Sequence, residues 1–201
     1  MKRLFPILFL LLLSLGLRAQ DHALLDRILE VNSSAKSFDS DLCNTLKKTN
    51  QSTTQQGKLY FVKPDRFAAL FDNGKHMVVN KDRLKMDIGL FHGKFRLKEE
   101  GMMRSLSNIF LYGFQGRCKE LAEENDYSLE LKEVGSFQQV TFTSKKRSFL
   151  GIGYKQVIFN FEKENLKLKE IILIDTRNVV DIYTISDTRY DVPVDPNKFD
   201  I

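Results

Sequence analysis

Hydrophobic and polar residues alternate along most of this chain with a period of two, the pattern of β-strands with one solvated face. The pattern predicts strands at 38–47, 57–63, 66–71, 76–80, 84–88, 127–134, 137–143, 154–161, 166–175 and 180–190. The polar segment 48–56 and the segment 90–94 are predicted to be loops. About ten strands in one chain predict a sheet that curls, because open twisted sheets rarely exceed about ten strands.

Turn residues between these strands favour antiparallel hairpins. Pro64 ends the second strand, because proline removes a hydrogen-bond donor from the ladder and fixes its own φ. The segment 72–74 reads Asp-Asn-Gly, and these residue types accept the positive φ of a tight hairpin. We therefore expect an antiparallel meander.

The hydrophobic period changes to three or four residues in two places, which predicts amphipathic helices. The first helix covers 21–34, and its apolar positions are Leu24, Leu25, Ile28, Leu29 and Val31. The second covers 102–113, and a short charged helix is predicted to follow it at 118–124. The expected fold class is α+β, mainly antiparallel β: an incomplete, half-open β-barrel of about ten or eleven strands covered by helices.

The segment 1–19 has the layout of a secretory signal peptide. Lys2 and Arg3 precede an unbroken apolar run at 4–13, and the small residue Ala19 stands at the expected cleavage point. The apolar run is too short to span a membrane. An uncleaved anchor helix is the alternative interpretation.

Removal of this segment changes what the net charge indicates. The whole chain carries a formal charge of +5, and loss of Lys2, Arg3 and Arg18 lowers it to +2. The remaining 20–201 has the length of a single domain. The basic run 145–147 has no interleaved aromatic residues, so no nucleic-acid partner is expected.

Export would place the two cysteines, Cys43 and Cys118, in an oxidising compartment, where they could form one disulfide. A bridge closing a loop of this length would stabilise the chain by about 4 kcal/mol. The alternative is that both are small apolar residues of the core. The absence of a Cys-x-x-Cys pair excludes a zinc ribbon and a thioredoxin-type site.

Candidates for catalytic chemistry are few. His22 lies in the first predicted helix, His76 beside a hairpin and His92 in a predicted loop, and none has a second ligand at metal-binding spacing. Neither a nucleophile elbow nor a zinc-protease motif occurs. We therefore expect a protein without catalytic residues, metal or cofactor; a hydrolase using His76 or His92 is the weakest alternative.

The apolar residues of the chain are more informative about its function than its titratable groups. The sequence contains 16 phenylalanines, and two amphipathic helices must cover the predicted sheet. A curved sheet covered in this way encloses either a packed core or a cavity for an apolar ligand. Alternation alone does not distinguish these two outcomes.

The segment 57–67 reads Gly-Lys-Leu-Tyr-Phe-Val-Lys-Pro-Asp-Arg-Phe. It resembles a motif of the periplasmic outer-membrane lipoprotein carrier (LolA) family, in which a glycine-led strand is followed by a basic residue, a proline, a turn residue and a phenylalanine. The leading helix, the hairpin at 72–74, the helical insertion and the ending at 195–201 are similar to that family in layout.

This resemblance implies a periplasmic carrier of a Gram-negative bacterium. The carrier would be a monomer that takes the acyl chains of lipoproteins from an inner-membrane releasing transporter and passes them to an outer-membrane acceptor. It also implies that Lys63 holds a lid, at a position where the family usually has arginine. The chain departs from the family by lacking tryptophan and by having Met-Val-Val at 77–79 in place of an aromatic strand. A diverged carrier of another lipid or a glycolipid is therefore the main alternative.

The candidate residues of the apolar cavity come from the predicted strands and the inserted helix. They are Phe38, Leu42, Tyr60, Phe67, Phe71, Leu106, Ile109 and Phe110. Each could equally be an ordinary core residue, and a register shift of one position would turn a strand residue outward.

Overall fold

A computed structural model describes residues 21–88, 91–99, 101–145 and 153–201 of the chain. All strands of this part belong to one antiparallel sheet of eleven strands. The strands are β1 (Ser37–Lys48), β2 (Gln51–Val62), β3 (Arg66–Phe71), β4 (His76–Asn80), β5 (Arg83–Ile88), β6 (Phe91–Arg96), β7 (Tyr127–Val134), β8 (Phe137–Ser144), β9 (Tyr154–Glu162), β10 (Leu168–Asp175) and β11 (Val180–Tyr190).

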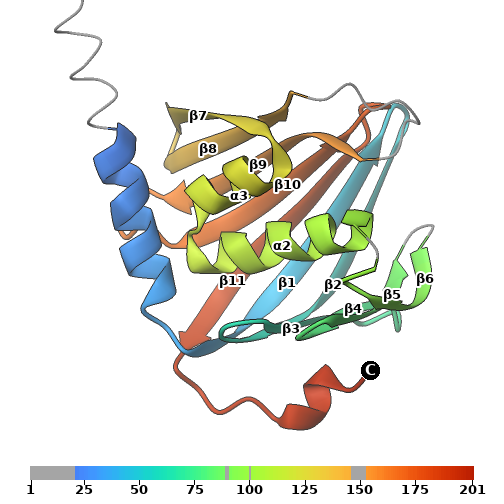
Figure 1. The fold of residues 1–201 in the computed structure, drawn as a ribbon. Helices are drawn as coiled ribbons and strands as arrows, with labels where there is room; N and C mark the ends of the chain where they lie inside the picture. Colours follow the sequence, from blue (N-terminus) through green and yellow to red (C-terminus); the bar gives the residue numbers. More distant parts are fainter. Residues whose placement is uncertain (1–20, 89–90, 100, 146–152) are drawn as a thin grey trace, which may run out of the picture.

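The strand order is β6-β5-β4-β3-β2-β1-β11-β10-β9-β8-β7. Strands that are consecutive in sequence pair with each other, except β6 and β7, which are separated by α2 and α3. The first and last strands meet at the centre, where Leu42 is opposite Ile185. The sheet curves so that β3 to β6 lie on one side of the inserted helices and β7 to β10 on the other (Figure 1). It does not close into a barrel, and β6 and β7 are its edges. The predicted fold class is confirmed.

Three helices cover the concave face of the sheet (Figure 1). The N-terminal helix covers 21–33, and α2 (Gly101–Gln115) and α3 (Cys118–Asn125) follow β6. A short 3-10 helix, η1 (Pro196–Phe199), lies against the opposite, convex face. None of the described helices is long and apolar enough to cross a membrane.

The polar segment predicted as a loop at 48–56 is the main error in the predicted secondary structure. β2 begins at Gln51, and the turn at 49–50 is short. Thr45 and Thr54 lie opposite each other with their Oγ1 atoms 3.2 Å apart, and Gln55 donates to Asn44. These cross-strand contacts replace apolar burial, so the strand is present without the expected alternation.

The predicted loop at 90–94 is also wrong over its described part, because 91–94 belongs to β6. β6 pairs with β5 along its whole length, and Gly93 has a φ of 140° at the middle of the strand. A short strand with a central glycine gives almost no alternating signal. The predicted signal peptide and Lys146 and Arg147 of the basic run lie outside the described residues.

Apolar side chains form two clusters, one on each face of the sheet. The larger cluster lies between the concave face and the helices. The smaller one consists of Ala68, Val78 and Phe199, with partly buried residues around them. Phe199 brings the C-terminal segment onto β3 and β4, and Asn80 donates to its carbonyl oxygen at 3.1 Å.

The rest of the convex face is largely polar and is cross-linked between strands. Asn160 on β9 accepts a hydrogen bond from Gln139 on β8 at 3.0 Å and donates to Glu170 on β10 at 2.8 Å. Thr184 on β11 also donates to Glu170, at 3.4 Å. Side-chain hydrogen bonds therefore connect four neighbouring strands on this face.

Candidate functional site

The concave face is built around a cluster of aromatic rings contributed by both the sheet and α2. The Phe67 ring lies 5.6 Å from that of Phe110 and 5.5 Å from that of Phe114. Phe38 and Phe61 stack at 5.1 Å, and Phe114 packs edge-on against Phe38 at 5.5 Å. Rings at these separations make favourable offset and edge-to-face contacts. The helix α2 is thus seated on the sheet mainly through aromatic contacts.

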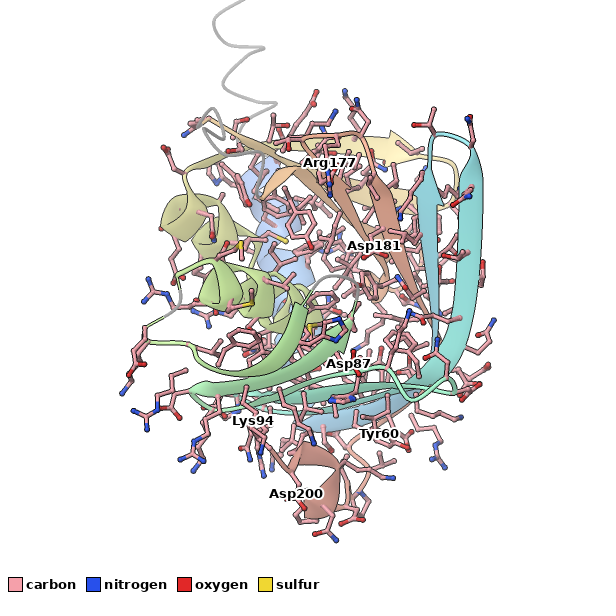
Figure 2. All side chains as sticks on the ribbon, turned by 90° about the vertical axis from the view of Figure 1, so that its right-hand side faces the viewer. Tyr60, Asp87, Lys94, Arg177, Asp181 and Asp200 are labelled. Carbon is pink, nitrogen blue, oxygen red and sulfur yellow. The ribbon has the colours of Figure 1, made fainter. Side chains whose placement is uncertain are left out.

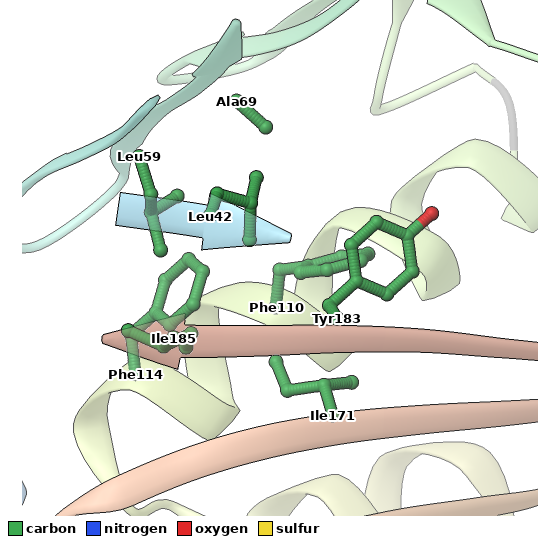
Figure 3. A pocket seen from close by; sticks show the side chains of 8 residues that line it. All are labelled: Leu42, Leu59, Ala69, Phe110, Phe114, Ile171, Tyr183 and Ile185. Atoms are coloured by element: carbon green, nitrogen blue, oxygen red, sulfur yellow. The ribbon is translucent and has the colours of Figure 1, made fainter. Parts of the chain in front are cut away.

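One small apolar cavity remains between α2 and the sheet, with a volume of about 10 Å³. Its lining residues converge from five strands and the helix (Figure 3): Leu42, Leu59, Ala69, Phe110, Phe114, Ile171, Tyr183 and Ile185. Ligand pockets usually measure about 300–1,000 Å³, and this volume is about that of one water molecule. In this arrangement the interior is therefore almost filled by side chains.

Seven of the eight predicted lining residues lie buried on the concave face. They are Phe38, Leu42, Phe67, Phe71, Leu106, Ile109 and Phe110. Leu42 and Phe110 line the cavity itself, and Phe38 lines a second small cavity beneath the N-terminal helix. Their role in binding a ligand stays a prediction.

Tyr60 lies on the convex face, so its prediction as a cavity residue was wrong. Its neighbours Leu59 and Phe61 are the inward-facing residues of β2, each 1% exposed. Tyr60 instead packs beside the Ala68–Val78–Phe199 cluster, and the Lys198 ammonium lies 5.3 Å from its ring centroid. The sequence offers four consecutive apolar residues at 59–62, so alternation could not assign the faces.

Six lining residues were not predicted, and most had a detectable signal. Phe114 follows Phe110 by four residues, the spacing that puts side chains on the same helix face. Ile171, Tyr183 and Ile185 occupy alternate positions of strands that were correctly predicted. Leu59 and Ala69 required the register of β2 and β3, which only the structure supplies.

A carboxyl group interrupts the apolar character of the concave face. Asp181 is two residues before Tyr183 on β11 and accepts hydrogen bonds from the Tyr183 hydroxyl at 2.9 Å and the Asn44 amide at 2.5 Å. Burial raises the pKa of Asp181 above its ordinary value, although these two hydrogen bonds oppose the shift. Burial also raises the pKa of Tyr183, and the adjacent Asp181 adds to this effect. Tyr183 joins this polar cluster to the apolar cavity, which its own side chain lines.

The motif at 57–67 has a structural explanation that begins with its glycine. A Cβ atom at Gly57 would lie 2.3 Å from the Leu70 carbonyl oxygen and 2.9 Å from the Phe71 Cα. Both are backbone atoms of the neighbouring strand β3, so a side chain cannot be accommodated by a rotamer change. Glycine at this position allows β2 and β3 to approach closely on the concave face.

The other motif residues connect the sheet to the helices. Lys63 Nζ donates to the carbonyl oxygen of Ser33, the last residue of the N-terminal helix, at 2.6 Å. The Pro64 carbonyl oxygen accepts a hydrogen bond from Gln115, the last residue of α2, at 3.0 Å. Phe67 lies beneath the α2 aromatic rings. The motif therefore ties both covering helices to one turn of the sheet.

A second set of contacts holds the end of the N-terminal helix from the opposite half of the sheet. Asn32 donates to the Leu166 carbonyl oxygen at 2.8 Å and accepts from the Leu168 amide at 3.2 Å. Lys167 Nζ donates to the Val31 carbonyl oxygen at 2.9 Å, and burial lowers the pKa of Lys167. The last turn of this helix is consequently bridged to both halves of the sheet.

The N-terminal helix also rests directly on the junction between α2 and α3. Gly116 has a φ of 68°, and a Cβ atom there would lie 2.5 Å from the Ile28 carbonyl oxygen. The same atom would lie 3.1 Å from the Leu29 Cα. The N-terminal helix and the α2–α3 junction therefore approach each other closely through backbone atoms at Gly116.

The two cysteines are free in this arrangement, which favours the alternative interpretation of two unpaired thiols. Cys118 is buried among the apolar residues under α3, where burial strongly raises the pKa of its thiol. Cys43 alternates with the inward-facing Leu42 and lies on the convex face, where Gln56 donates to its sulfur at 3.5 Å. A thiol on each face of the sheet cannot meet the short distance that a disulfide needs.

The histidines lie away from the apolar site. His92 Nδ1 lies 2.6 Å from Asp87 Oδ1 on the convex side of β5 and β6, and Asp87 is opposite His76 on β4. His22 lies on the exposed side of the N-terminal helix. Within the described ranges, no group of three His, Cys, Asp or Glu residues could hold a metal ion.

Comparison with known proteins gives matches at the level of structure only. No protein-family model matches the sequence. No curated protein matches it either.

Several solved structures resemble this chain. An uncharacterized conserved protein from Thermus thermophilus aligns with a TM-score of 0.50 at 9% identity, covering 90% of this chain and 92% of that chain. A LolA superfamily protein from Nitrosomonas europaea gives a TM-score of 0.45 at 12% identity, with 90% and 97% covered. A DUF1329 family protein from Desulfovibrio piger gives 0.47 at 14% identity, with 89% and 96% covered. The likeness to the Thermus protein shows a shared fold.

Proposed function

We propose that this protein is a non-enzymatic periplasmic carrier that shields the acyl chains of lipoproteins against its concave face and transfers them from the inner to the outer membrane. The observation that carries the proposal is the way α2 covers this face. The helix contributes Phe110 and Phe114 to an apolar interface between two layers, and Gln115 supplies a hydrogen bond to the sheet. Such an interface can exchange its apolar contacts for those of a lipid.

The energetics of this exchange are balanced. Burying a large apolar side chain stabilises by about 1.5–3 kcal/mol, so the four α2 residues Leu106, Ile109, Phe110 and Phe114 contribute about 6–12 kcal/mol. An acyl chain of about sixteen carbons gains about 12 kcal/mol at about 0.8 kcal/mol per buried CH₂. Acyl chains can therefore replace the helix on the sheet, and the helix can replace the chains on release.

The cavity of about 10 Å³ requires that the covering helices move before a chain can enter. Lys63 and Gln115 bind the ends of the two helices to the same turn, which makes this turn the latch of the lid. Lys63 binds a single carbonyl oxygen as a point charge, whereas arginine would offer a planar fork of donors. We infer a latch that opens at modest free-energy cost and closes behind the cargo.

The partners of this carrier would be an acylated lipoprotein, an inner-membrane transporter that releases it and an outer-membrane acceptor. The carrier would act as a monomer after removal of residues 1–19. Another lipid or a glycolipid as cargo is the alternative, favoured by Asp181, because a carboxyl group on the concave face offers a hydrogen-bond acceptor to a polar head group.

The first test is direct. The protein is purified from its native host compartment, its bound molecules are extracted with organic solvent, and the extract is analysed by mass spectrometry. We expect a lipoprotein or its acyl chains. A free lipid or glycolipid in the extract would show that the cargo is that lipid instead of a lipoprotein. An empty extract together with no binding of a fluorescent fatty acid would contradict carriage of any lipid.

The second test places a charge in the interface. Phe110→Glu should reduce fluorescent fatty-acid binding at least about tenfold, because a carboxylate would lie against the acyl chain. Arg104→Glu on the exposed side of the same helix is the matched control and should leave binding unchanged. Circular dichroism checks that both variants are folded. Equal fatty-acid binding by the two variants would show that α2 does not contribute to the binding site.

A further inference from the structure

The outer face of β5 and β6 carries an unusual arrangement of charges. In the register of this hairpin, Arg83 lies opposite Arg96 and Lys85 lies opposite Lys94. Like charges directly opposite each other on neighbouring strands are destabilising. The sequence nevertheless places two such pairs side by side, on the face that does not contact the helices.

These cations have little compensation from neighbouring acids. Within the described residues, Arg96 forms an exposed ion pair with Glu99 at 3.4 Å, and no carboxylate lies within ion-pair distance of Arg83, Lys85 or Lys94. Asp87, the remaining acid of this face, is held by His92. We call the surface formed by Arg83, Lys85, Lys94 and Arg96 the basic hairpin face.

The opposite edge of the sheet shows that this arrangement is not a general feature of the protein. On β7, Lys132 pairs with Glu130 at 2.9 Å, and Glu133 pairs with Lys163 of the neighbouring turn at 2.8 Å. Charged edge strands resist edge-to-edge aggregation, and β7 achieves this with both signs. Protection against edge-to-edge aggregation does not explain Arg83 and Lys85, because β5 is not an edge strand.

The basic hairpin face belongs to the convex side of the sheet. Leu84 and Met86 of β5 lie in the apolar cluster under the helices, so the alternating residues Arg83 and Lys85 face the other side. Figure 2 shows Lys94 on the strands that lie directly above the C-terminal segment carrying Asp200. A strand pair that presents four cations on one face has the chemistry of a surface that binds anionic lipid head groups.

We propose that the basic hairpin face docks the protein onto an anionic phospholipid bilayer. Each lysine or arginine held near such a bilayer strengthens binding about fivefold. Contact through the convex side of β5 and β6 would leave the opposite edge of the sheet, β7, facing solvent. This docking does not depend on which lipid or lipoprotein the concave face carries.

The experiment is vesicle co-sedimentation of the purified protein. Vesicles of phosphatidylcholine containing one third phosphatidylglycerol are compared with pure phosphatidylcholine, in about 50 mM and about 500 mM NaCl. We expect the wild type to sediment with the anionic vesicles at low salt alone. Lys94→Glu changes the charge of the face by two units, which predicts binding about 25-fold weaker.

The matched control is Lys132→Glu, which makes the same change in net charge at the opposite edge of the sheet. It should leave vesicle binding within about twofold of the wild type. Thermal unfolding separates docking from a structural role, because Lys94→Glu creates an opposite-charge pair with Lys85 and should raise the melting temperature while weakening binding. A lower melting temperature for Lys94→Glu would favour a structural role.

Two outcomes would overturn the proposal. Equal loss of binding by Lys94→Glu and Lys132→Glu would show that net charge alone governs attraction. Absence of wild-type binding to either vesicle would exclude lipid and leave an acidic protein surface as the occupant. Fatty-acid binding by the same samples keeps this result separate from carriage: Lys94→Glu should bind the fluorescent probe as the wild type does.

Discussion

The two faces of the sheet are made from the same strands and have opposite properties. The concave face carries the larger apolar cluster and is covered by helices. The convex face is more polar, and its apolar residues are the small cluster around Phe199 and the half-buried row Ile158, Ile172 and Ile182, which pair across β9, β10 and β11. On the convex face, hydrogen bonds between side chains of neighbouring strands cross-link the sheet. The sheet can therefore remain intact while the contacts on its concave face are exchanged, which is what a carrier requires.

The largest expected effect is a difference in lost unfolding free energy between substitutions at two neighbouring residues of β2, which face opposite sides of the sheet. Phe61→Ala should cost about 3–5 kcal/mol of unfolding free energy, because it leaves a cavity among the concave aromatic rings. Tyr60→Ala should cost about 1–1.5 kcal/mol, since only part of its ring is covered by the C-terminal segment. Urea unfolding followed by circular dichroism measures both. Similar losses would contradict the division into two faces.

A second substitution acts on the cover of the concave face. Gly116→Ala should destabilise by about 1–3 kcal/mol from its left-handed backbone alone, and by more because the new Cβ meets the Ile28 carbonyl oxygen. Gly74→Ala is the control, because Gly74 has a φ of 84° and no atom within 4 Å of the added Cβ. The excess loss at Gly116 isolates the contact between the helices. Equal losses would show that this contact contributes nothing.

A smaller effect concerns Asp181, the polar exception on the concave face. Because folding raises the pKa of this carboxyl, the folded protein binds its proton more tightly than the unfolded chain does. Its contribution to stability is therefore most favourable below the unfolded pKa and declines as pH rises through the folded pKa. The stability of the wild type relative to Asp181→Asn should fall over this range, measured by urea unfolding at a series of pH values. A constant difference would show that folding leaves this pKa unchanged.

The smallest perturbation is chemical labelling of the two thiols, one near each face. Cys43 on the convex face should react with a thiol reagent in the folded protein, while Cys118 should react only after unfolding, because it is buried and its pKa is raised. Quantitation of the released chromophore should give one thiol in buffer and two in denaturant. A count of zero in denaturant under non-reducing conditions would indicate a disulfide instead.

The sequence predicted the elements with clear periodicity and missed those stabilised in other ways. The amphipathic helix α2 and the strands β3, β4 and β11 are close to their expected bounds, because each is rich in apolar residues and is bounded by turn residues or a change of period. The first half of β2 was missed because threonine and glutamine ladders hold it outside the covered core. No hydrophobic pattern accompanies a strand that is exposed on both faces.

In the candidate site, prediction succeeded where the local sequence pattern alone determines which way a side chain points. Leu42 and Phe110 follow from alternation and helical spacing, and both line the cavity. Tyr60 failed because it lies in a continuous apolar run, where the face is set by pairing with β1 and β3. The tie between Gln115 and Pro64 could not be predicted, because it joins segments 51 residues apart whose relative position depends on the curvature of the sheet.

The pairing of β1 with β11 has a consequence for how the chain folds. Hairpins within β2 to β6 and within β7 to β10 join segments that are close in sequence, so they can form early and locally. The central pair joins the first strand to the last, and closing so long a loop is slow because its entropy is lost before its contacts are gained. We therefore expect two half-sheets to form first and to be joined along this seam only when the final strand is available. A chain ending before β11 would leave β1 and β10 as open edges in addition to β6 and β7, with Leu42 deprived of its partner Ile185.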